Sequence, residues 1–313
     1  MTRSTTEKLR LGRHTLTLHR QDKALLPGTG PGAPDITKRD LVGYYRAIAP
    51  HVLPHLRRRP LMLERLPDGL DGDRIMQKNT PAYFPDWIGR VEVGKEGGTV
   101  LHPLCDDTAT LVYLADQATV TLHRWPSRAP AVERPDRLVF DLDPPGDDDF
   151  DAVRHAARLV RELLDEVGLA CGVMTTGSRG LHVVAVLRGE HTFDDVHSFA
   201  KKAADTLAAA HPDRLTTAMR KQDRGNRLYL DVQRNAYAQT SVTPYTVRAK
   251  PGGPVATPLT WGQLEDPELT AQRWTIANAV EQADTDPWAG LPGRGRALGP
   301  AAAKLRALRD SGG

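Results

Sequence analysis

The second half of the chain predicts an α+β fold built on an antiparallel, ferredoxin-like sheet. Strands are recognised by apolar residues that alternate with polar ones, and helices by an apolar stripe at a spacing of three and four residues. Both patterns recur here in the order strand, helix, strand, strand, helix, strand, which is the ferredoxin-like order. The expected elements are a strand at 137–143, a helix at 149–167, strands at 171–176 and 181–187, a helix at 193–210 and a strand at 227–232.

The first half predicts an N-terminal α/β subdomain over about 9–130 that packs on this palm. Thr37 is a plausible helix N-cap, and Asp40 follows it at the spacing of a capping box. The other expected elements are a strand or hairpin edge at 9–18, a helix to about 56, strands at 61–66, 99–105 and 119–123, and a helix at 108–116. The Pro- and Arg-rich stretch 126–136 is the expected internal boundary, with the palm at about 135–285. Together these form one domain over 1–288, followed by a basic Gly/Ala-rich tail at 289–313.

The composition indicates a globular protein without membrane segments. The chain has 313 residues and no apolar run long enough to span a bilayer. Its N-terminus is polar and basic, without the apolar core of a signal peptide. Two cysteines, Cys105 and Cys171, provide no disulfide framework and no CxxC metal spacing. We therefore expect a protein of the reducing cytoplasm.

The charges are unevenly distributed along the chain. Residues 1–60 contain 12 Lys and Arg against 4 Asp and Glu, and residues 214–250 contain 8 against 2. Residues 141–151, in contrast, contain six Asp. Basic flanks around an acidic centre suit a polyanion held against a metal site. For any single Lys or Arg, solvated surface charge is the simpler explanation.

The strand at 137–143 contains two carboxylates that a buried strand does not need. Asp141 and Asp143 share one face because strand side chains alternate, and their Cα atoms lie about 6–7 Å apart. Two like charges this close repel each other, and a divalent metal is the simplest compensation. An Asp that opens the turn at Pro144 is the alternative. It explains Asp143 but not Asp141.

A third acid, Asp231, lies in the alternating run at 227–232. On a neighbouring strand it would complete a two-metal site that leaves positions for phosphate oxygens and water. The alternative is a strand-edge charge that pairs with Arg227 or Arg234.

Two further segments suit phosphate binding. In Thr175–His182, two glycines bracket hydroxyls and Arg179 between two strands, so backbone N–H groups could cradle a phosphate; an ordinary Gly hairpin turn is the alternative. In the basic segment, cations are interleaved with Thr240 and Tyr245, which suits phosphate and base contacts; they are Lys221, Arg224, Arg227, Arg234, Arg248 and Lys250. His123 is a candidate phosphate contact, although His123 and His182 could both be buried structural residues.

Three motifs in order resemble a known family. They are Phe140-Asp-Leu-Asp-Pro144, Thr176-Gly-Ser-Arg-Gly-Leu-His182 and Asp231-Val-Gln-Arg-Asn235, the last followed by Thr240 and Pro244-Tyr-Thr-Val-Arg248. Together they closely resemble the polymerase domain of bacterial DNA ligase D, in the archaeo-eukaryotic primase superfamily. The resemblance covers roughly residues 10–285. It implies the primase fold and template-directed transfer of NTPs or dNTPs to DNA ends, with two divalent ions, Mn²⁺ preferred or Mg²⁺.

The resemblance also implies roles for single residues. By motif match, Asp141, Asp143 and Asp231 hold the metals, and Asp231 helps to activate the primer 3′-hydroxyl. The triphosphate is held by His123, Thr176, Arg179 and Arg248, with Lys221 and Arg224 lining the same site. Lys23 and Lys38 match residues that hold the 5′-phosphate of a downstream DNA strand.

Some positions depart from the family pattern. Thr176 and Arg179 replace a Ser and a Lys but keep the chemistry. Arg20 stands where Asn is common, Glu64 where Lys is common, and Ile75-Met76 where two Phe stack on the template. These changes predict a weak effect of a downstream 5′-phosphate.

Partners and rival functions complete the expectations from sequence. No ligase or phosphoesterase domain is recognisable, so a stand-alone, nucleoid-associated bacterial enzyme is expected, acting on gapped or broken DNA in non-homologous end joining with Ku and a separate ligase. One alternative is a non-catalytic module that binds or bridges DNA ends. Another is a metal-dependent nuclease or phosphatase that uses the same acids.

Overall fold

The computed structural model describes residues 6–144, 146 and 149–311. The chain forms two compact units, and each is built from segments that are distant in sequence. Unit 1 comprises Met1–Arg124, Val242–Thr257 and Trp274–Thr285, and unit 2 comprises Trp125–Ser241, Pro258–Arg273 and Asp286–Gly313. Asp147 and Asp148 of the acidic run lie outside the described residues.

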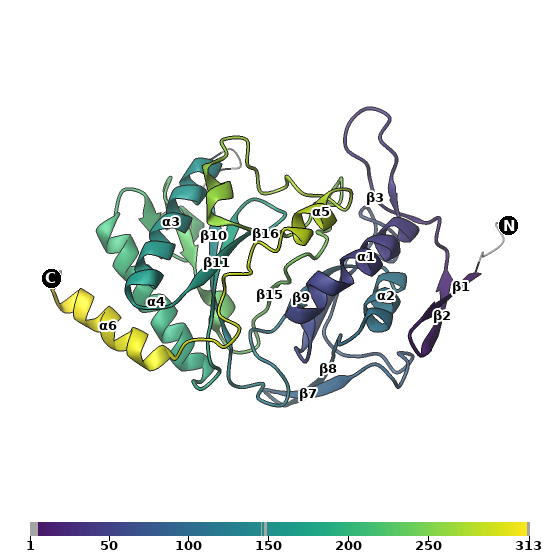
Figure 1. The fold of residues 1–313 in the computed structure, drawn as a ribbon, viewed down its shortest axis with the longest axis horizontal. Coiled ribbons are helices and arrows are strands. Elements are labelled where there is room, and N and C mark those ends of the chain that lie inside the picture. Colours follow the sequence, from purple (N-terminus) through teal and green to yellow (C-terminus); the bar gives the residue numbers. More distant parts are fainter. Residues whose placement is uncertain (1–5, 145, 147–148, 312–313) are drawn as a thin grey trace. The chain divides into compact units, whose positions relative to one another are not determined.

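Unit 2 contains the predicted palm (Figure 1). Its sheet has the strand order β13-β14-β10-β12-β11-β16, in which the edge strand β13 runs parallel to β14 and all other neighbouring strands are antiparallel. This confirms the ferredoxin-like antiparallel arrangement. The strands are β10 (Arg137–Asp143), β11 (Cys171–Thr175), β12 (Leu181–Val186), β13 (Leu215–Thr216), β14 (Leu228–Asp231) and β16 (Pro258–Leu259).

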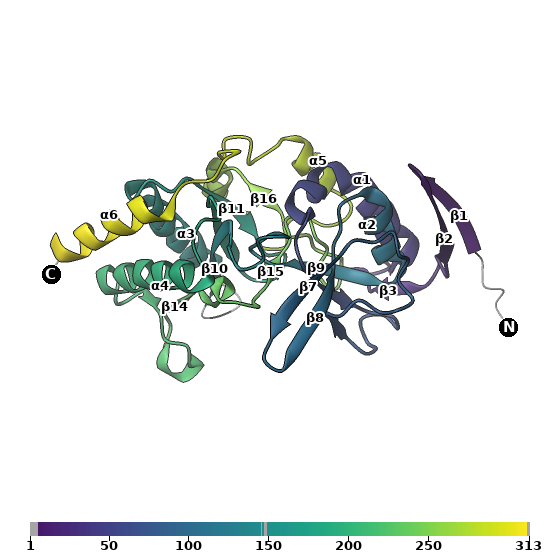
Figure 2. The ribbon, with the colours of Figure 1, turned by 90° about the horizontal axis from the view of Figure 1, so that it is seen from below.

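Two amphipathic helices, α3 (Phe150–Glu166) and α4 (Phe193–Ala210), cover one face of this sheet (Figures 1 and 2). Both contact β10, and they contact each other. The α3 helix begins at Asp149, whose side chain accepts a hydrogen bond from the Ala152 amide, and α4 begins with a capping box between Thr192 and Asp195. Their apolar faces bury Phe140 and Leu142 of β10, both fully inaccessible to solvent, in the core.

The C-terminal segment forms a helix that the sequence did not predict. The α6 helix (Leu298–Ser311) packs on α4 through buried Leu298, Ala301 and Leu305. Just before it, the amide of Arg296 donates to the Val186 carbonyl at 2.9 Å. Few apolar residues among many Gly, Ala and Arg gave no helical stripe to detect. Among the described residues, no helix has the length and apolarity needed to cross a membrane.

Unit 1 is organised around a four-stranded sheet of order β15-β9-β5-β6. Its strands are β5 (Leu61–Arg65), β6 (Ile75–Gln77), β9 (Thr119–Arg124) and β15 (Ser241–Val242). The remaining elements are the paired strands β1 (Thr6–Leu11) with β2 (His14–His19), β3 (Ala24–Leu26) with β4 (Ile36–Thr37) and β7 (Arg90–Lys95) with β8 (Gly98–Pro103), and helices α1 (Lys38–Leu56), α2 (Thr108–Asp116) and α5 (Ala279–Asp284). The predicted capping box of Thr37 and Asp40 opens α1.

The division into units includes crossings that the sequence did not predict. The chain leaves unit 1 after Arg124, next to the boundary expected at 126–136, but residues 242–257 and 274–285 return to unit 1. There the Thr246 hydroxyl accepts a hydrogen bond from the Leu122 amide of β9 at 2.8 Å and lies 2.9 Å from the Tyr45 hydroxyl. These buried bonds join segments more than 100 residues apart, so no local pattern could reveal them.

Candidate active site

The register of the palm sheet brings the three predicted acids onto one face. On β10, Asp141 lies opposite Asp231 of β14 on one side and opposite His182 of β12 on the other. Asp143 lies opposite Tyr229. Residues that are directly paired across strands share a face of the sheet, so all five side chains project from the same side.

Asp141 is the most buried and the most fully paired of the acids. Its Oδ1 lies 3.2 Å from His182 Nε2, and its Oδ2 accepts a hydrogen bond from Arg234 Nε at 3.2 Å. Burial by itself raises the pKa of this carboxyl, but His182 and Arg234 outweigh it and hold the pKa at about 2. Asp141 therefore stays ionised.

Asp143 lies in a different environment although it is only two residues away. Burial raises its pKa, and repulsion from Asp141 and Asp231 raises it further; Arg179 and His182 offset this only in part. The third acid, Asp231, accepts a hydrogen bond from the Gln233 amide at 2.8 Å. The face thus holds more negative charge at Asp143 than the nearby cations neutralise.

The loop between β11 and β12 is a self-capped turn. The Thr176 hydroxyl accepts hydrogen bonds from the amides of Ser178 at 3.3 Å and Gly180 at 3.2 Å. Position 180 must be glycine, because a Cβ there would lie 2.0 Å from the Leu142 carbonyl oxygen. The turn geometry expected as the alternative is therefore present. It also brings the charge of Arg179 within electrostatic range of Asp143.

The basic segment before β14 is anchored on the same face. Arg224 donates to the carbonyls of Ala218 at 3.0 Å and Met219 at 2.7 Å, and its guanidinium carbon lies 3.8 Å above the centre of the Tyr229 ring. This stacking fixes a cation beside Asp143, since Tyr229 is its cross-strand partner. Lys221 is exposed in the short 3₁₀ turn Lys221–Asp223.

His123 and Arg248 belong to unit 1, whereas the acids belong to unit 2. On β9, His123 Nε2 lies 3.5 Å from Oε2 of the buried Glu64. Glu64 also pairs with Arg74 at 3.2 Å. Arg248 is half-buried, and its amide donates to the Pro254 carbonyl at 2.7 Å.

The two lysines expected to bind a 5′-phosphate both have carboxylate partners. The Lys38 ammonium is buried and contacts the Asp116 carboxylate at 3.0 Å and its carbonyl at 2.8 Å. Burial lowers the pKa of Lys38, and Asp116 opposes that effect. Lys23 pairs with Asp68 at 2.7 Å. A phosphate would have to compete with these carboxylates for both ammonium groups.

The donor chemistry of the acids fits divalent cations, but their present arrangement does not form a complete metal site. Carboxylate oxygens are the ligands that Mg²⁺ and Mn²⁺ prefer. Across the part of the chain that the structure describes, no group of three or more His, Cys, Asp or Glu is placed to hold a metal ion. This accords with the pairing of both Asp141 oxygens to His182 and Arg234.

Comparison with known proteins gives the family. A model of the LigD primase-polymerase domain matches residues 37–288. The chain belongs to this family. The multifunctional non-homologous end joining DNA repair protein LigD of Mycobacterium tuberculosis H37Rv is 33% identical over 262 residues, which is 81% of this chain and 34% of that protein. The bifunctional LigD of Bacillus subtilis is 31% identical over 247 residues, 79% of this chain and 39% of that protein.

A solved structure of the same family shares the fold. The polymerase domain of Mycobacterium tuberculosis ligase D in complex with DNA aligns with a TM-score of 0.80 at 31% identity, covering 87% of this chain and 95% of that domain. The chain thus has the archaeo-eukaryotic primase-like fold. It spans about a third of the length of the LigD proteins it matches.

Two polar residues of unit 2 make contacts that the sequence did not predict. Arg234 was expected either as a partner of Asp231 or as one of the cations that suit phosphate contacts, yet its guanidinium pairs with Asp141. It lies in the short 3₁₀ turn Gln233–Asn235, which follows β14 directly. Gln272 donates to the Ser178 carbonyl at 2.7 Å and so braces the β11–β12 turn. Gln272 lies 94 residues after Ser178 in the sequence, so no local pattern could connect the two.

Proposed function

We propose that this chain is a metal-dependent, template-directed nucleotidyltransferase of the ligase D type. It extends or fills DNA ends with NTPs or dNTPs in double-strand break repair by non-homologous end joining. The observation that carries the proposal is the placement of Asp141, Asp143 and Asp231 on one palm face, in a chain that belongs to the LigD primase-polymerase family.

Asp141, Asp143 and Asp231 would hold two divalent ions, Mn²⁺ in preference to Mg²⁺. When bound, such ions lower the pKa of an attacking hydroxyl and stabilise the charge of a leaving pyrophosphate. The uncompensated charge around Asp143 supports this assignment, since a carboxylate with a raised pKa gains most from a nearby cation. Asp231 would also orient the primer 3′-hydroxyl.

Cations of the chain would orient the triphosphate. Arg179 acts electrostatically on Asp143, and Arg224 is fixed over Tyr229 on the same face. A guanidinium binds phosphate oxygens bidentately and holds them in one orientation. By the family resemblance, we assign the same task to Thr176, Lys221, His123 and Arg248.

We propose DNA as the main macromolecular partner, in the form of template-primer, gapped or broken ends. The aligned mycobacterial domain was solved in complex with DNA, which supports this assignment. Ku and a DNA ligase are proposed protein partners, since the relatives are non-homologous end joining proteins.

Primer extension with Mn²⁺ or Mg²⁺ and either NTPs or dNTPs tests the proposal. The double variant Asp141→Ala/Asp143→Ala should lose activity by on the order of a thousandfold or more, because it removes two of the three carboxylates that would hold the ions. The variant Asp213→Ala/Asp223→Ala is the matched control, since it removes two exposed carboxylates of unit 2. Extension that persists in the first variant would contradict the proposal.

The same assay on a gapped duplex tests whether a downstream 5′-phosphate stimulates extension. Lys23 and Lys38 already have carboxylate partners, and Glu64 stands where the family usually has Lys, so we expect weak stimulation. We expect extension with and without the downstream 5′-phosphate to differ by less than a factor of about 3, as for an exposed ion pair. A large stimulation by the phosphate would mean that both lysines exchange their carboxylate partners for it.

A non-catalytic DNA-end-binding or bridging module is the second candidate. The pairing of both Asp141 oxygens with protein cations favours it, because the acids do not form a metal site as they stand. Binding of broken ends without incorporation of any nucleotide, with every metal tried, would support this function. Hydrolysis of DNA without added nucleotide would instead indicate a nuclease.

A further inference from the structure

A pocket lined by four arginines lies at the far end of β10 from the acids. Arg128, Arg137, Arg188 and Arg294 surround a cavity of about 370 Å³. Arg137 begins β10, so Asp141 and Asp143 lie about 13 and 20 Å from it along the strand. All four arginines belong to unit 2, and Arg294 lies beyond the residues that match the family model.

The pocket contains more positive charge than its own acids neutralise. One carboxylate oxygen, Asp136 Oδ2, serves both Arg128 at 3.0 Å and Arg137 at 3.4 Å. The other acid, Glu190, is 3.9 Å from Arg188, and both side chains are largely exposed. Burial lowers the pKa of Arg137, and neighbouring Arg128 lowers it further, although Asp136 opposes this. Two carboxylates for four guanidinium groups leave room for an anion.

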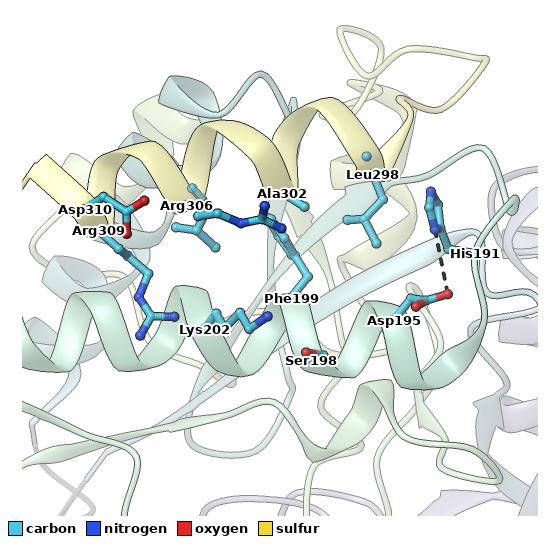
Figure 3. Close-up of a pocket in the computed structure, with 12 residues that line it drawn as sticks. His191, Asp195, Ser198, Phe199, Lys202, Leu298, Ala302, Arg306, Arg309 and Asp310 are labelled. Atoms are coloured by element: carbon cyan, nitrogen blue, oxygen red, sulfur yellow. Dashed lines mark ion pairs between the residues drawn. The ribbon is translucent and has the colours of Figure 1, made fainter.

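A second row of cations continues this charge along the C-terminal helix (Figure 3). A groove of about 440 Å³ runs between α4 and α6. Three cations, Lys202, Arg306 and Arg309, and two carboxylates, Asp195 and Asp310, line it, so the cations exceed the acids by one. Figure 3 shows Arg309 reaching from α6 toward α4. The pocket and the groove are neighbours on the surface, because Arg188 of the pocket and Leu298 of the groove line one shallow depression, which has no room for a water molecule.

We propose that this pocket and groove form one cationic track that binds the phosphates of a single nucleic-acid strand, away from the acids. The track consists of Arg128, Arg137, Arg188, Arg294, Lys202, Arg306 and Arg309. Its cations extend from the pocket at the start of β10 to the groove between α4 and α6, which suits a polymer with repeated charges. The choice of nucleic acid rather than an acidic protein as the ligand rests on the proposed function. The excess of positive charge is observed independently of that function.

Strand binding is measured without metal or nucleotide, so that catalysis plays no part. The probe is a fluorescein-labelled single-stranded oligonucleotide, followed by anisotropy over a range of salt concentrations. The variants Arg188→Gln/Arg294→Gln and Arg306→Gln/Arg309→Gln each remove two exposed cations of the track. The control Lys201→Gln/Lys304→Gln removes two exposed cations of α4 and α6 that do not line the groove.

Each track variant should bind the strand on the order of tenfold more weakly at low salt. The slope of log affinity against log salt should fall by about 1.4, since each single-strand phosphate contact contributes about 0.7. The control should keep the wild-type slope. Track variants that match the control would overturn the inference.

Binding of other anions to the same variants shows whether the track recognises a nucleic-acid strand, a small phosphate compound or an acidic protein. If Arg188→Gln/Arg294→Gln weakens binding of free nucleoside triphosphate or inorganic phosphate but not of the strand, the strand assignment is wrong. Equal losses for polyglutamate and the oligonucleotide would point to an acidic protein and overturn it too. Failure of the proposed function would show separately, as extension unaffected by Asp141→Ala/Asp143→Ala while the track variants still lose the strand.

Discussion

At the scale of the residue, the pKa values of two carboxyl groups on one strand are shifted in opposite directions. Asp141 divides its oxygens between His182 and Arg234, and its pKa stays low despite burial. Asp143 meets two other acids, and its pKa is raised. Environments that separate the pKa values of neighbouring groups are a mark of functional sites. Because the pKa of Asp143 is raised, a positive charge bound beside it would stabilise its ionised form.

Glu64 provides a test of electrostatics away from the acids. Burial raises its pKa, but hydrogen bonds from His123 and Thr121 and the charge of Arg74 outweigh burial and lower it. At neutral pH, Glu64→Gln should reduce the free energy of unfolding by about 1–2 kcal/mol, the usual size for a hydrogen bond to a charged group.

The sign of the pH dependence follows from the lowered pKa. Stability from Glu64 is fully present above the pKa of the unfolded chain, about 4.3, and is lost as pH falls through the lower folded pKa. The gap between wild type and Glu64→Gln should therefore close below about pH 4.3. Urea unfolding across pH measures it, with exposed Glu96→Gln as the control. A gap that is the same at all pH values would refute the ion-pair explanation.

At the scale of the element, the backbone of β10 is hydrogen-bonded by a side chain as well as by its neighbouring strands. The β14 strand pairs with β10 only from Asp141 to Asp143. Upstream, Asn235 takes over: its Oδ1 accepts from the Val139 amide at 2.8 Å, and its Nδ2 donates to the Val139 carbonyl at 2.7 Å. Asn235 is fully buried and thereby fixes the turn that carries Arg234 to Asp141.

Asn235→Ala should therefore destabilise unit 2 strongly. It leaves the buried amide and carbonyl of Val139 without their partners, which costs about 3 kcal/mol or more in the free energy of unfolding. Thermal or urea unfolding measures the loss. Asn226→Ala, at an exposed loop position, is the control and should change little. Equal stability of the two variants would show that the hydrogen bonds of Asn235 to the Val139 backbone do not stabilise β10.

At the scale of the whole molecule, the chain passes between its two units five times: after residues 124, 241, 257, 273 and 285. Residues 242–257 supply buried partners to unit 1, among them the backbone carbonyl of Tyr245, which accepts from Tyr44 Oη at 2.9 Å. Neither unit is therefore a continuous stretch of sequence that could fold by itself.

A fragment of residues 1–130 should accordingly fail to fold. It would lack residues 242–257 and 274–285 and would expose Tyr44 and Tyr45, both buried in the full chain. We expect no cooperative thermal transition by circular dichroism, whereas the full chain unfolds in a sharp transition. A cooperative melt of the fragment would show that the returning segments are dispensable.

The sequence by itself determined the palm, because its signals are local. Alternation and helical spacing are read within a few residues, and they placed β10 at its observed bounds and predicted the ferredoxin-like order. The three motifs that contain Asp141, Asp143 and Asp231 also indicated the family, and the match of its model to residues 37–288 confirms this. The two-residue strands β13 and β16 and the helix α6 carried too little periodic signal to be predicted.

Only the tertiary structure decided which charges meet. Strand register placed His182 and Asp231 on either side of Asp141, and a turn after β14 brought Arg234 to the same carboxylate. The allocation of residues 242–257 to unit 1 and the arginine pocket at the start of β10 likewise depend on segments distant in sequence. Electrostatic interactions depend on distance in space, so the charged groups could be identified from the sequence but their partners only from the fold.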